Sequence, residues 1–494
     1  MIFRNTAAAR RGHTSAWLVP ACLVVAGLLV LGAAMVGLSL VLAAGVGIAL
    51  IALAAWRWPV WTAVFYAAFM SVDRFVVLLV FHVTGSDLLT KMAQLWKDEV
   101  VALLLARVVY QLLFTKAPRR IQYVDLLVMA FIVLTAVYLV YPGPFNVDPF
   151  TRLQGFRTDA TFLFAYLIGR GLAIDRRQLR WLTLALIPGS LVGMAVALWQ
   201  VLAPTSAGHF FDLLGFQQFS GLQGTLTSEA IRGRGVNGVD LPRASALQLG
   251  DLALAFYQLY LVVIAAALFF EARVRRDQLL SGAFLIAMGG TLILTGSRSA
   301  IVAGAVAVTA MAILGRAPLR LIVVGGAGLA CGLIALIASG VDLTLVPRLL
   351  TLSDPSSVAH ASAAVRSLDL IQSQPFGGGL GTAGTIGQRY LGDLSITNEN
   401  WFLQIGSEMG VIGAVLFAAI CVAVTALATH RYLGVKDYWL RVLTLSTVGA
   451  GLGFLVLGNF LHAWENTVLS IFIWLMAGLA LRSRSLEASE EYQR

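Results

Sequence analysis

The chain has 494 residues, of which 59% are hydrophobic and only 12% are charged. Soluble domains carry about 25% charged residues, so this composition excludes an ordinary soluble protein and predicts a polytopic membrane protein. The formal net charge of +10 could suggest nucleic-acid binding, but the basic residues gather in short segments between apolar runs, which is a topology signal. We therefore expect the chain to lie in a lipid bilayer and to bind no nucleic acid.

Apolar segments follow one another along nearly the whole chain. Because a membrane-spanning helix needs about 20 apolar residues, the sequence predicts an all-α polytopic membrane protein with about 14 transmembrane helices, or 12–14 as a range. The segments cover residues 17–36, 38–56, 59–83, 97–114, 123–141, 157–173, 180–203, 248–271, 278–297, 299–315, 320–340, 400–428, 439–460 and 466–481. The third segment is unusual because it carries Asp73 and Arg74 in its middle.

Basic residues gather at alternate ends of these segments. By the positive-inside rule, most of the 35 lysines and arginines lie on the cytoplasmic side, together with both termini. Two long segments, residues 204–247 and 341–399, are then expected on the outer side and should contain short amphipathic helices. Residues 1–494 are treated as a single integral membrane domain, and residues 483–494 as its short cytoplasmic tail.

One surface helix is predicted inside the second outer segment. Asp354 can cap its start and Pro355 fits its first turn. The helix should stop near Ser373, before Pro375. Apolar residues recur along one face, so we expect this helix to lie on the membrane surface or to pack on the bundle.

Arginines on the outer side stand beside glycines or at helix ends. Arg298 is the most informative, because it lies in L-T-G-S-R-S-A, where a turn between two apolar runs must reach the membrane boundary. A membrane arginine is costly unless it is paired or faces water, and its planar guanidinium suits phosphate oxygens. Several of them could therefore bind a pyrophosphate, although Arg298 could also reach lipid headgroups or pair with Asp251. The set comprises Arg152, Arg157, Arg232, Arg234, Arg243, Arg298 and Arg366.

The polar stretch Val365–Gly413 separates two apolar regions. Arg366 is followed after ten residues by Gly377, and Glu399 after ten residues by Gly410. The run Q-P-F-G-G-G-L-G-T-A-G between these two spacings predicts a tight turn that leads back to the membrane. The glycines expected to shape the stretch are Gly377, Gly379, Gly381 and Gly410. Arg366 has an alternative role, because Asp369 lies three residues further along the same predicted helix.

Glu399 stands just before the apolar segment that begins at Trp401. It could act as a general base on a hydroxyl, or it could simply favour the helix N-terminus. The flanking Asn398 and Asn400 suit sugar hydroxyls, and Trp401 could be a sugar platform or a residue of the interfacial aromatic belt. Glu408, in the second turn, could shape the surroundings of Glu399 or pair with an arginine.

Metal chemistry has little support in the sequence. His462 and Glu465 share an outer turn, but a metal site needs more ligands than this pair offers, so an interfacial turn is the preferred interpretation. The long outer segments contain no D-x-D pair for a divalent cation. We therefore expect neither a metal nor another cofactor.

Four stretches, in order, resemble the hallmark region of the O-antigen ligase and polymerase superfamily. They are L-P-R-A-S-A-L-Q-L-G-D, I-L-T-G-S-R-S-A, the R-x10-G stretch running into Q-P-F-G-G-G-L-G-T-A-G, and E-N-W-F-L-Q-I-G-S-E-M-G-V-I-G. The resemblance implies a GT-C-like membrane glycosyltransferase of the bacterial inner membrane that uses undecaprenyl-diphosphate-linked glycan at the periplasmic face, without metal. It also implies that Arg243, Arg298 and Arg366 bind the donor diphosphate and that Glu399 activates the acceptor hydroxyl.

The chain departs from the ligases of this superfamily at one position. Those ligases typically carry histidine followed by asparagine where this chain has Glu399 and Asn400, and an acid there is commoner among exopolysaccharide and capsule polymerases. The resemblance thus favours an inverting polymerase that joins lipid-linked repeat units, with a chain-length regulator and a flippase as candidate partners. The alternatives are a ligase acting on lipid A core or a protein, and, outside the enzyme class, a lipid-linked oligosaccharide flippase.

Overall fold

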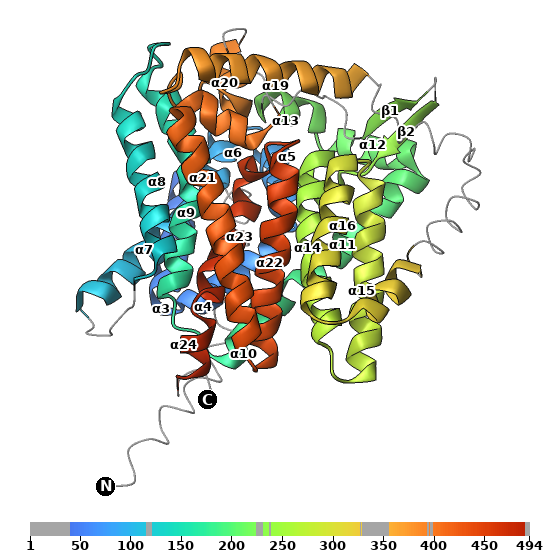
Figure 1. Cartoon of the computed structure of the whole chain (residues 1–494). Helices are drawn as coiled ribbons and strands as arrows, with labels where there is room; N and C mark the ends of the chain where they lie inside the picture. The colour runs from blue at the N-terminus through green and yellow to red at the C-terminus, as the bar shows by residue number, and fades with distance from the viewer. Residues whose placement is uncertain are drawn as a thin grey trace.

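The computed structural model describes residues 40–489 except for 115–120, 224–230, 237–238, 327, 329–354, 393–394 and 396–398. This part of the chain is a bundle of α-helices with one two-stranded sheet (Figure 1). It contains six helices that are long and apolar enough to cross a membrane, or seven if a bent pair is counted as one span. The prediction of an all-α polytopic membrane protein is confirmed. The total of about 14 helices stays a prediction, because two predicted segments lie wholly or mostly outside these residues.

The first half of the described chain contributes eleven helices, α3 to α13. They are α3 (Leu40–Arg57), α4 (Pro59–Phe69), α5 (Asp73–Thr84), α6 (Asp87–Gln94), α7 (Trp96–Phe114), α8 (Tyr123–Val140), α9 (Pro149–Gly171), α10 (Arg176–Leu184), α11 (Leu186–Leu202), α12 (Pro204–Leu213) and α13 (Phe216–Gln223). Helix α9 begins well before the predicted start at residue 157, because Asp148 caps it by accepting from Phe150 N and Thr151 N at 2.9 and 3.0 Å. Hydrogen bonds from Thr151 also lower the pKa of Asp148.

The second half begins with the hairpin β1–β2, which the sequence did not predict. The elements of this second half are β1 (Arg232–Val236), β2 (Val239–Arg243), η1 (Ala246–Gln248), α14 (Asp251–Glu271), α15 (Arg275–Leu294), α16 (Arg298–Leu314), α19 (Pro355–Ser373), α20 (Gly384–Leu391), α21 (Trp401–Gly434), α22 (Tyr438–Gly458), η4 (Ala463–Glu465), α23 (Thr467–Ala480) and α24 (Ser483–Glu487). The bounds of α19 confirm the predicted surface helix, which lies across one end of the bundle (Figure 1).

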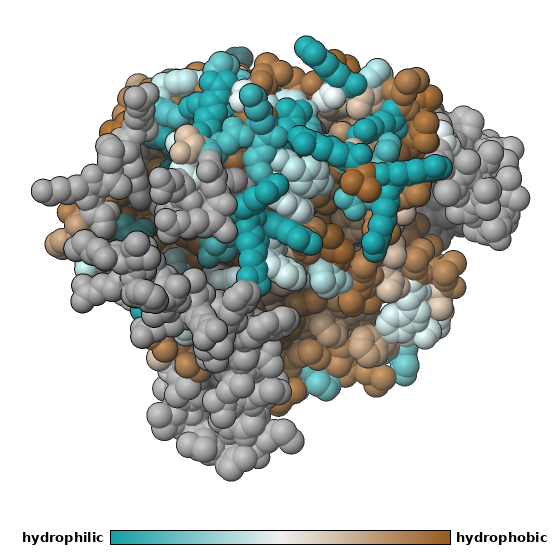
Figure 2. Space-filling model, turned by 90° about the horizontal axis from the view of Figure 1, so that it is seen from below, coloured by the Kyte–Doolittle hydropathy of each residue, from teal (hydrophilic) through white to brown (hydrophobic). Residues whose placement is uncertain are grey.

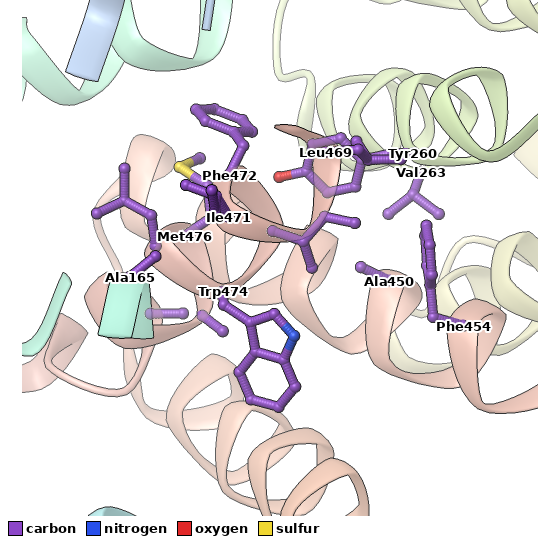
Figure 3. Packing of buried hydrophobic residues seen from close by; sticks show 14 of the residues in the cluster. Ala165, Tyr260, Val263, Ala450, Phe454, Leu469, Ile471, Phe472, Trp474 and Met476 are labelled. Carbon is purple, nitrogen blue, oxygen red and sulfur yellow. The ribbon is translucent and has the colours of Figure 1, made fainter. Parts of the chain in front are cut away.

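The core of the bundle is built around α23. Figure 3 shows side chains of α23 with Ala165 of α9 on one side and Tyr260 of α14 and Phe454 of α22 on the other. On another side, Gly169 of α9 and Gly478 of α23 face each other, so that their backbones are in contact. Such small residues let membrane helices approach closely and gain dispersion energy where the hydrophobic effect contributes little.

The predicted span at residues 59–83 is not a straight helix, which corrects the prediction. It consists of α4 and α5, which are bent by 77° relative to each other. The break frees backbone carbonyls, and Gln248 Nε2 donates to two of them, Met70 O at 3.1 Å and Ser71 O at 3.2 Å. The bend also places Asp73, which is almost fully buried, in the first turn of α5. A charged residue that would disrupt a straight span thus lies at a helix start.

Connections between helices meet at two opposite ends, which we call the upper end and the lower end after their places in Figure 1. At the upper end, Ala244 N, directly after β2, donates to Leu294 O at 3.0 Å and joins the end of β2 to the end of α15. At the lower end, Arg441 pairs with Glu271 at 2.6 Å and joins α22 to the last residue of α14. The upper end also carries α12, α13, α19, α20 and the β1–β2 hairpin (Figure 1).

The lower end is rich in arginine. Figure 2 views the molecule from this end and shows hydrophilic side chains gathered over it, beside apolar ones. Arg176 pairs with Asp437 at 3.0 Å, and Arg482 donates to Leu172 O at 2.8 Å. An excess of basic residues is typical of the cytoplasmic side of a membrane protein.

Candidate active site

The glycine-rich loop between α19 and α20 is inserted into a break in α21. The break is at Gly410, whose φ of 70° and ψ of −173° are not helical. It frees the carbonyls of Ser407 and Glu408, which accept from Gly378 N at 2.7 Å and from Gly379 N at 3.0 Å. The loop therefore supplies the backbone donors that the interrupted helix lacks.

Gly377 of the loop and Gly410 of α21 are in direct backbone contact where the loop crosses the helix. We call this contact the glycine crossing. A methyl group built on Gly377 would lie 2.5 Å from both Glu408 O and Gly410 N. One built on Gly410 would overlap Pro375 O and would lie 2.7 Å from Phe376 Cα. Both glycines also have positive φ, so a side chain at either position is excluded by conformation as well as by space. Gly379 and Gly381, at φ of 111° and 77°, shape the rest of the loop.

The two ten-residue spacings correspond to two arms that leave this crossing. One arm is the end of α19 and leads back to Arg366, while the other is the start of α21 and leads back to Glu399. At 1.5 Å per helical residue, each arm is roughly 15 Å long. Ile371 of α19 packs on Gly406 of α21, so the arms stay together beyond the crossing. Arg366 and Glu399 are thus the outer ends of two matched arms.

Glu399 lies half-buried immediately before the N-cap of α21. Asn400 is that cap: its Oδ1 accepts from Leu403 N at 3.0 Å, and its Nδ2 donates to Asn459 O at 2.9 Å. Asn400 therefore fixes the start of α21 against the end of α22, and with it the backbone that carries Glu399. Asn398 lies outside the described residues.

Arg243 and Arg298 flank one turn at the same end of the bundle. Arg298 is the first residue of α16, and Gly296 lies two residues before it. A methyl group on Gly296 would lie 3.2 Å from Arg243 Nε, so the Arg243 side chain packs directly on this turn. Arg243 also pairs with Asp251 at 2.7 Å, which is the partner that the sequence suggested for Arg298.

The remaining arginines are placed in different ways. Arg366 is exposed on α19; its contact is with Ser362 Oγ at 3.4 Å, and the ion pair expected as its alternative is not formed. Arg157 makes a two-pronged ion pair with Asp98, with a shortest distance of 2.6 Å. Arg152 donates to the last carbonyls of α8, at 2.9 and 2.6 Å. Arg234 lies in β1, opposite Leu241 of β2.

Trp401 is fully buried, which corrects both roles expected for it. Its ring packs against Phe162 and Phe417, with centroid distances of 6.2 and 5.9 Å. A sugar platform or an interfacial belt residue would need an exposed ring. The first turn of α21 instead packs beside the end of α22, so its leading side chain faces the core.

Buried acids lie beneath the glycine-rich loop, and the sequence singled out only one of them as a candidate. Glu408 is 1% exposed and its Oε1 accepts from Ala383 N at 3.0 Å, so it holds the loop rather than pairing with an arginine. Asp159 of α9, also 1% exposed, lies beside Glu408 and interacts with its carboxyl group. Sequence reasoning missed Asp159, although an acid inside a membrane segment is itself a signal of function.

The third acid of this group is Glu465 of η4. Its Oε1 accepts from Gln404 Nε2 at 2.9 Å and from Thr385 N at 3.1 Å, so it holds the start of α20. His462 Nε2 lies 3.8 Å from Glu465 Oε2. The turn is therefore a packed part of the upper end rather than a simple interfacial turn. Among the described residues, no group of three or more histidine, cysteine or acidic side chains is placed to hold a metal ion.

The upper end thus combines groups suited to proton transfer with groups suited to anion binding. Glu399 and the His462–Glu465 pair can accept a proton, because a carboxylate and an imidazole are the usual general bases. Arg243, Arg298 and Arg366 supply guanidinium groups. The end of α22 lies between the start of α21 and the α16 side of the bundle, since it contacts both helices.

The O-antigen ligase family model (Wzy_C) matches residues 283–418. The matched region runs from α15 through the glycine crossing in α21, and it includes Arg298, Arg366 and Glu399. It confirms the resemblance to the O-antigen ligase and polymerase superfamily. Comparison with curated proteins gave no match. The chain is a multi-pass membrane protein, and its residues 283–418 are similar to the O-antigen ligase family.

Proposed function

We propose that this protein is a polymerase of lipid-linked polysaccharide repeat units. It transfers the glycan of an undecaprenyl-diphosphate-linked oligosaccharide to a sugar hydroxyl of a second lipid-linked unit, at the periplasmic face of the bacterial inner membrane. The observation that carries the proposal is the position of Glu399, whose carboxylate stands at the fixed start of α21, at the same end as Arg243 and Arg298.

The proposed reaction is a displacement at the anomeric carbon. Glu399 accepts the proton of the acceptor hydroxyl while the oxygen attacks that carbon. The bond from the anomeric carbon to the diphosphate oxygen breaks, and its electron pair leaves with the lipid diphosphate. Attack opposite the leaving group inverts the anomeric centre, and no step requires a cofactor.

The arginines act on the leaving group in this proposal. Arg243, Arg298 and Arg366 stabilise the charge that develops on the departing diphosphate, a form of stabilisation that is often the largest contribution to catalysis. Arg366 is exposed on its arm, so it is free to contact a ligand above the bundle. The glycine crossing fixes both arms, and fixed geometry is what lowers the entropic part of the barrier.

The proposed orientation places the lower end in the cytoplasm, with both termini. Arginines concentrated at that end support it. The upper end then faces the periplasm, where a lipid-linked substrate would arrive from a flippase. A chain-length regulator is a further candidate partner of a polymerase.

A ligase is a second candidate, because one observation favours it. His462, which lies beside Glu465, places an imidazole near the start of α20 at the same upper end. The ligases of the superfamily that this chain resembles typically carry a histidine at the position of the base. In that case the glycan would move to lipid A core or to a protein rather than to another lipid-linked unit.

The test is to identify what the reducing end of the product is attached to. Purified protein is supplied with lipid-diphosphate-linked repeat units in detergent, without any membrane gradient, and the products are separated by length. A ladder of longer glycans on lipid diphosphate is expected. Product formed only when lipid A core or a protein is added would establish the ligase instead, and a complete lack of turnover would favour the flippase.

A further inference from the structure

A second group of cations lies where α4 and α5 are bent. The bend is near the upper end, because Tyr66, in the last turns of α4, donates its hydroxyl to Val468 O at 2.9 Å, and Val468 is the second residue of α23. Arg74 is in the first turn of α5, beside Asp73. The start of α7 adds Lys97 to the same place.

Five charged side chains make up this group, which we call the bend cluster. The Trp96–Asp73 hydrogen bond and the Arg157–Asp98 ion pair bring the starts of α5 and α7 together beside α9, and Lys97 interacts with each of the other four charges. The members are Asp73, Arg74, Lys97, Asp98 and Arg157. Three cations against two anions leave an excess of one positive charge.

The two acids are already engaged by other groups. Asp98 accepts two hydrogen bonds from Arg157 Nε, at 3.0 and 3.1 Å, and a third from its Nη2, at 2.6 Å. Asp73 accepts from the indole N–H of Trp96. Within the described part of the chain, Arg74 and Lys97 have no hydrogen-bond or ion-pair partner.

A cationic side chain that is half-buried in a membrane protein without an ion-pair partner is costly in free energy unless a ligand binds to it. Arg74 and Lys97 are both half-buried, in a membrane protein, at the level where helices break. Broken helices near the membrane interior commonly form ligand sites, because their ends offer dipoles and free backbone groups. A guanidinium and an ammonium together suit a phosphate-type anion.

We propose that Arg74 and Lys97 bind the diphosphate of the acceptor lipid. The inference rests on the proposed polymerase function, in which donor and acceptor both carry a lipid diphosphate. A polymerase therefore needs two sites for lipid diphosphate in one membrane leaflet, one for the donor and one for the acceptor. A ligase that transfers the glycan to lipid A core or a protein needs only the donor site. Arg243 and Arg298 serve the donor, and the bend cluster serves the acceptor.

The two sites are connected through one short segment. Gln248 donates to the carbonyls of Met70 and Ser71, which the break between α4 and α5 leaves without helical donors. Five residues earlier in the chain, Arg243 packs on the turn that precedes Arg298. Gln200 fixes the segment between them, since its Oε1 accepts from Ser245 N at 2.9 Å. The segment L-P-R-A-S-A-L-Q therefore contributes Arg243 to the donor site and, through Gln248 at its end, contacts the bend that carries the acceptor site.

The experiment counts bound lipids on the full-length protein in a neutral detergent by native mass spectrometry, with undecaprenyl diphosphate as the probe. The wild-type chain is expected to bind two molecules. Arg74→Gln combined with Lys97→Gln should bind one, and adding Arg298→Gln should bind none. Lys91→Gln removes one positive charge from an exposed site on α6 and should still bind two.

Three results would overturn the inference. One is a single bound lipid on the wild-type chain, and another is two on the double variant. The third is displacement of the second molecule by an equal concentration of phosphatidylglycerol, which would mark a general headgroup site. The charge-conserving pair Arg74→Lys and Lys97→Arg should restore two bound lipids, which separates lost binding from misfolding. Two bound lipids without polymer formation would contradict the proposed polymerase function and the acceptor role, whereas the two diphosphate sites themselves would stand.

Discussion

Glu399 and Arg298 have separate tasks in the proposed reaction, and single substitutions can separate them. A proton acceptor is lost when a carboxylate becomes an amide of the same shape, whereas an anion site loses geometry when arginine becomes lysine. Both residues lie half-buried at helix starts, so conservative changes there should leave the fold intact.

Glu399→Gln should reduce polymer formation by about 10²- to 10⁴-fold, because that is the usual contribution of a general base. The amount of protein and its thermal unfolding should stay the same. Asp369→Asn is the matched control, since this acid is exposed on α19 and should be replaceable without loss. If the Glu399→Gln variant turns over at the wild-type rate, Glu399 is not the general base, and His462 becomes the candidate for that role.

Arg298→Lys should raise the KM for the donor about tenfold while the positive charge is retained. The reason is that lysine cannot reproduce the fork of the guanidinium on a diphosphate; a tenfold change corresponds to ~1.4 kcal/mol. Arg273→Lys, at an exposed lower-end position, is the control. An unchanged donor KM would argue against two-pronged binding by Arg298.

The buried carboxylate of Glu408 should contribute to stability through the loop that it holds. Glu408→Ala leaves Ala383 N without a partner and should lower the unfolding free energy by roughly 1–3 kcal/mol, whereas Glu408→Gln keeps an acceptor and should cost less. Thermal unfolding in detergent measures the difference. Equal losses in the two variants would show that the charge, rather than the hydrogen bond, matters.

At the scale of elements, the glycine crossing should be intolerant of any side chain. Gly410→Ala would place a side chain at φ 70° and ψ −173°, a backbone conformation that essentially only glycine adopts, at a cost of about 1–3 kcal/mol, and would push Pro375 and Phe376 away. We expect polymer formation to fall strongly even in protein that still folds. Gly289→Ala, on a helix with open space around it, should be neutral or slightly stabilising. Normal activity of Gly410→Ala would contradict a positional role for the crossing.

The sequence predicted those elements whose signals are local. Helix α19 was placed correctly because Pro355 and Pro375 mark its limits within the segment itself. The bend between α4 and α5 was not predicted, because the side chain that satisfies it, Gln248, is 177 residues away from Ser71. The burial of Trp401 was missed for the same reason, since it depends on the packing of α21 beside α22.

The candidate site was predictable as a set of residues but not as an arrangement. The two ten-residue spacings identified Arg366 and Glu399, and the sequence also placed Arg243 and Arg298 on the same side. The contact between Gly377 and Gly410 could not be foreseen, because it brings the loop after α19 against a break in α21, further along the chain. Asp159 was missed because a single acid has no spacing pattern.

At the scale of the whole molecule, the two ends should differ in access from the cell exterior. Gln218→Cys, on α13 at the upper end, should react with a membrane-impermeant thiol reagent in cells whose outer membrane is permeabilised, whereas Asp277→Cys at the lower end should not. The wild-type chain, which contains Cys22, Cys331 and Cys421, is labelled in parallel and gives the background. The opposite pattern would reverse the proposed orientation.

The glycine crossing has a further consequence for how the sequence can vary. Each residue inserted into an α-helix rotates the two flanking parts of the helix by about 100° relative to each other and separates them by about 1.5 Å. One extra residue between Glu399 and Gly410 would therefore turn the carboxylate away from its direction, even if all other contacts were kept. Helix α20 (Gly384–Leu391) lies outside both arms, so an insertion after its end leaves the phase of Arg366 and Glu399 relative to the crossing unchanged. We therefore expect the molecule not to tolerate a change in the length of either arm.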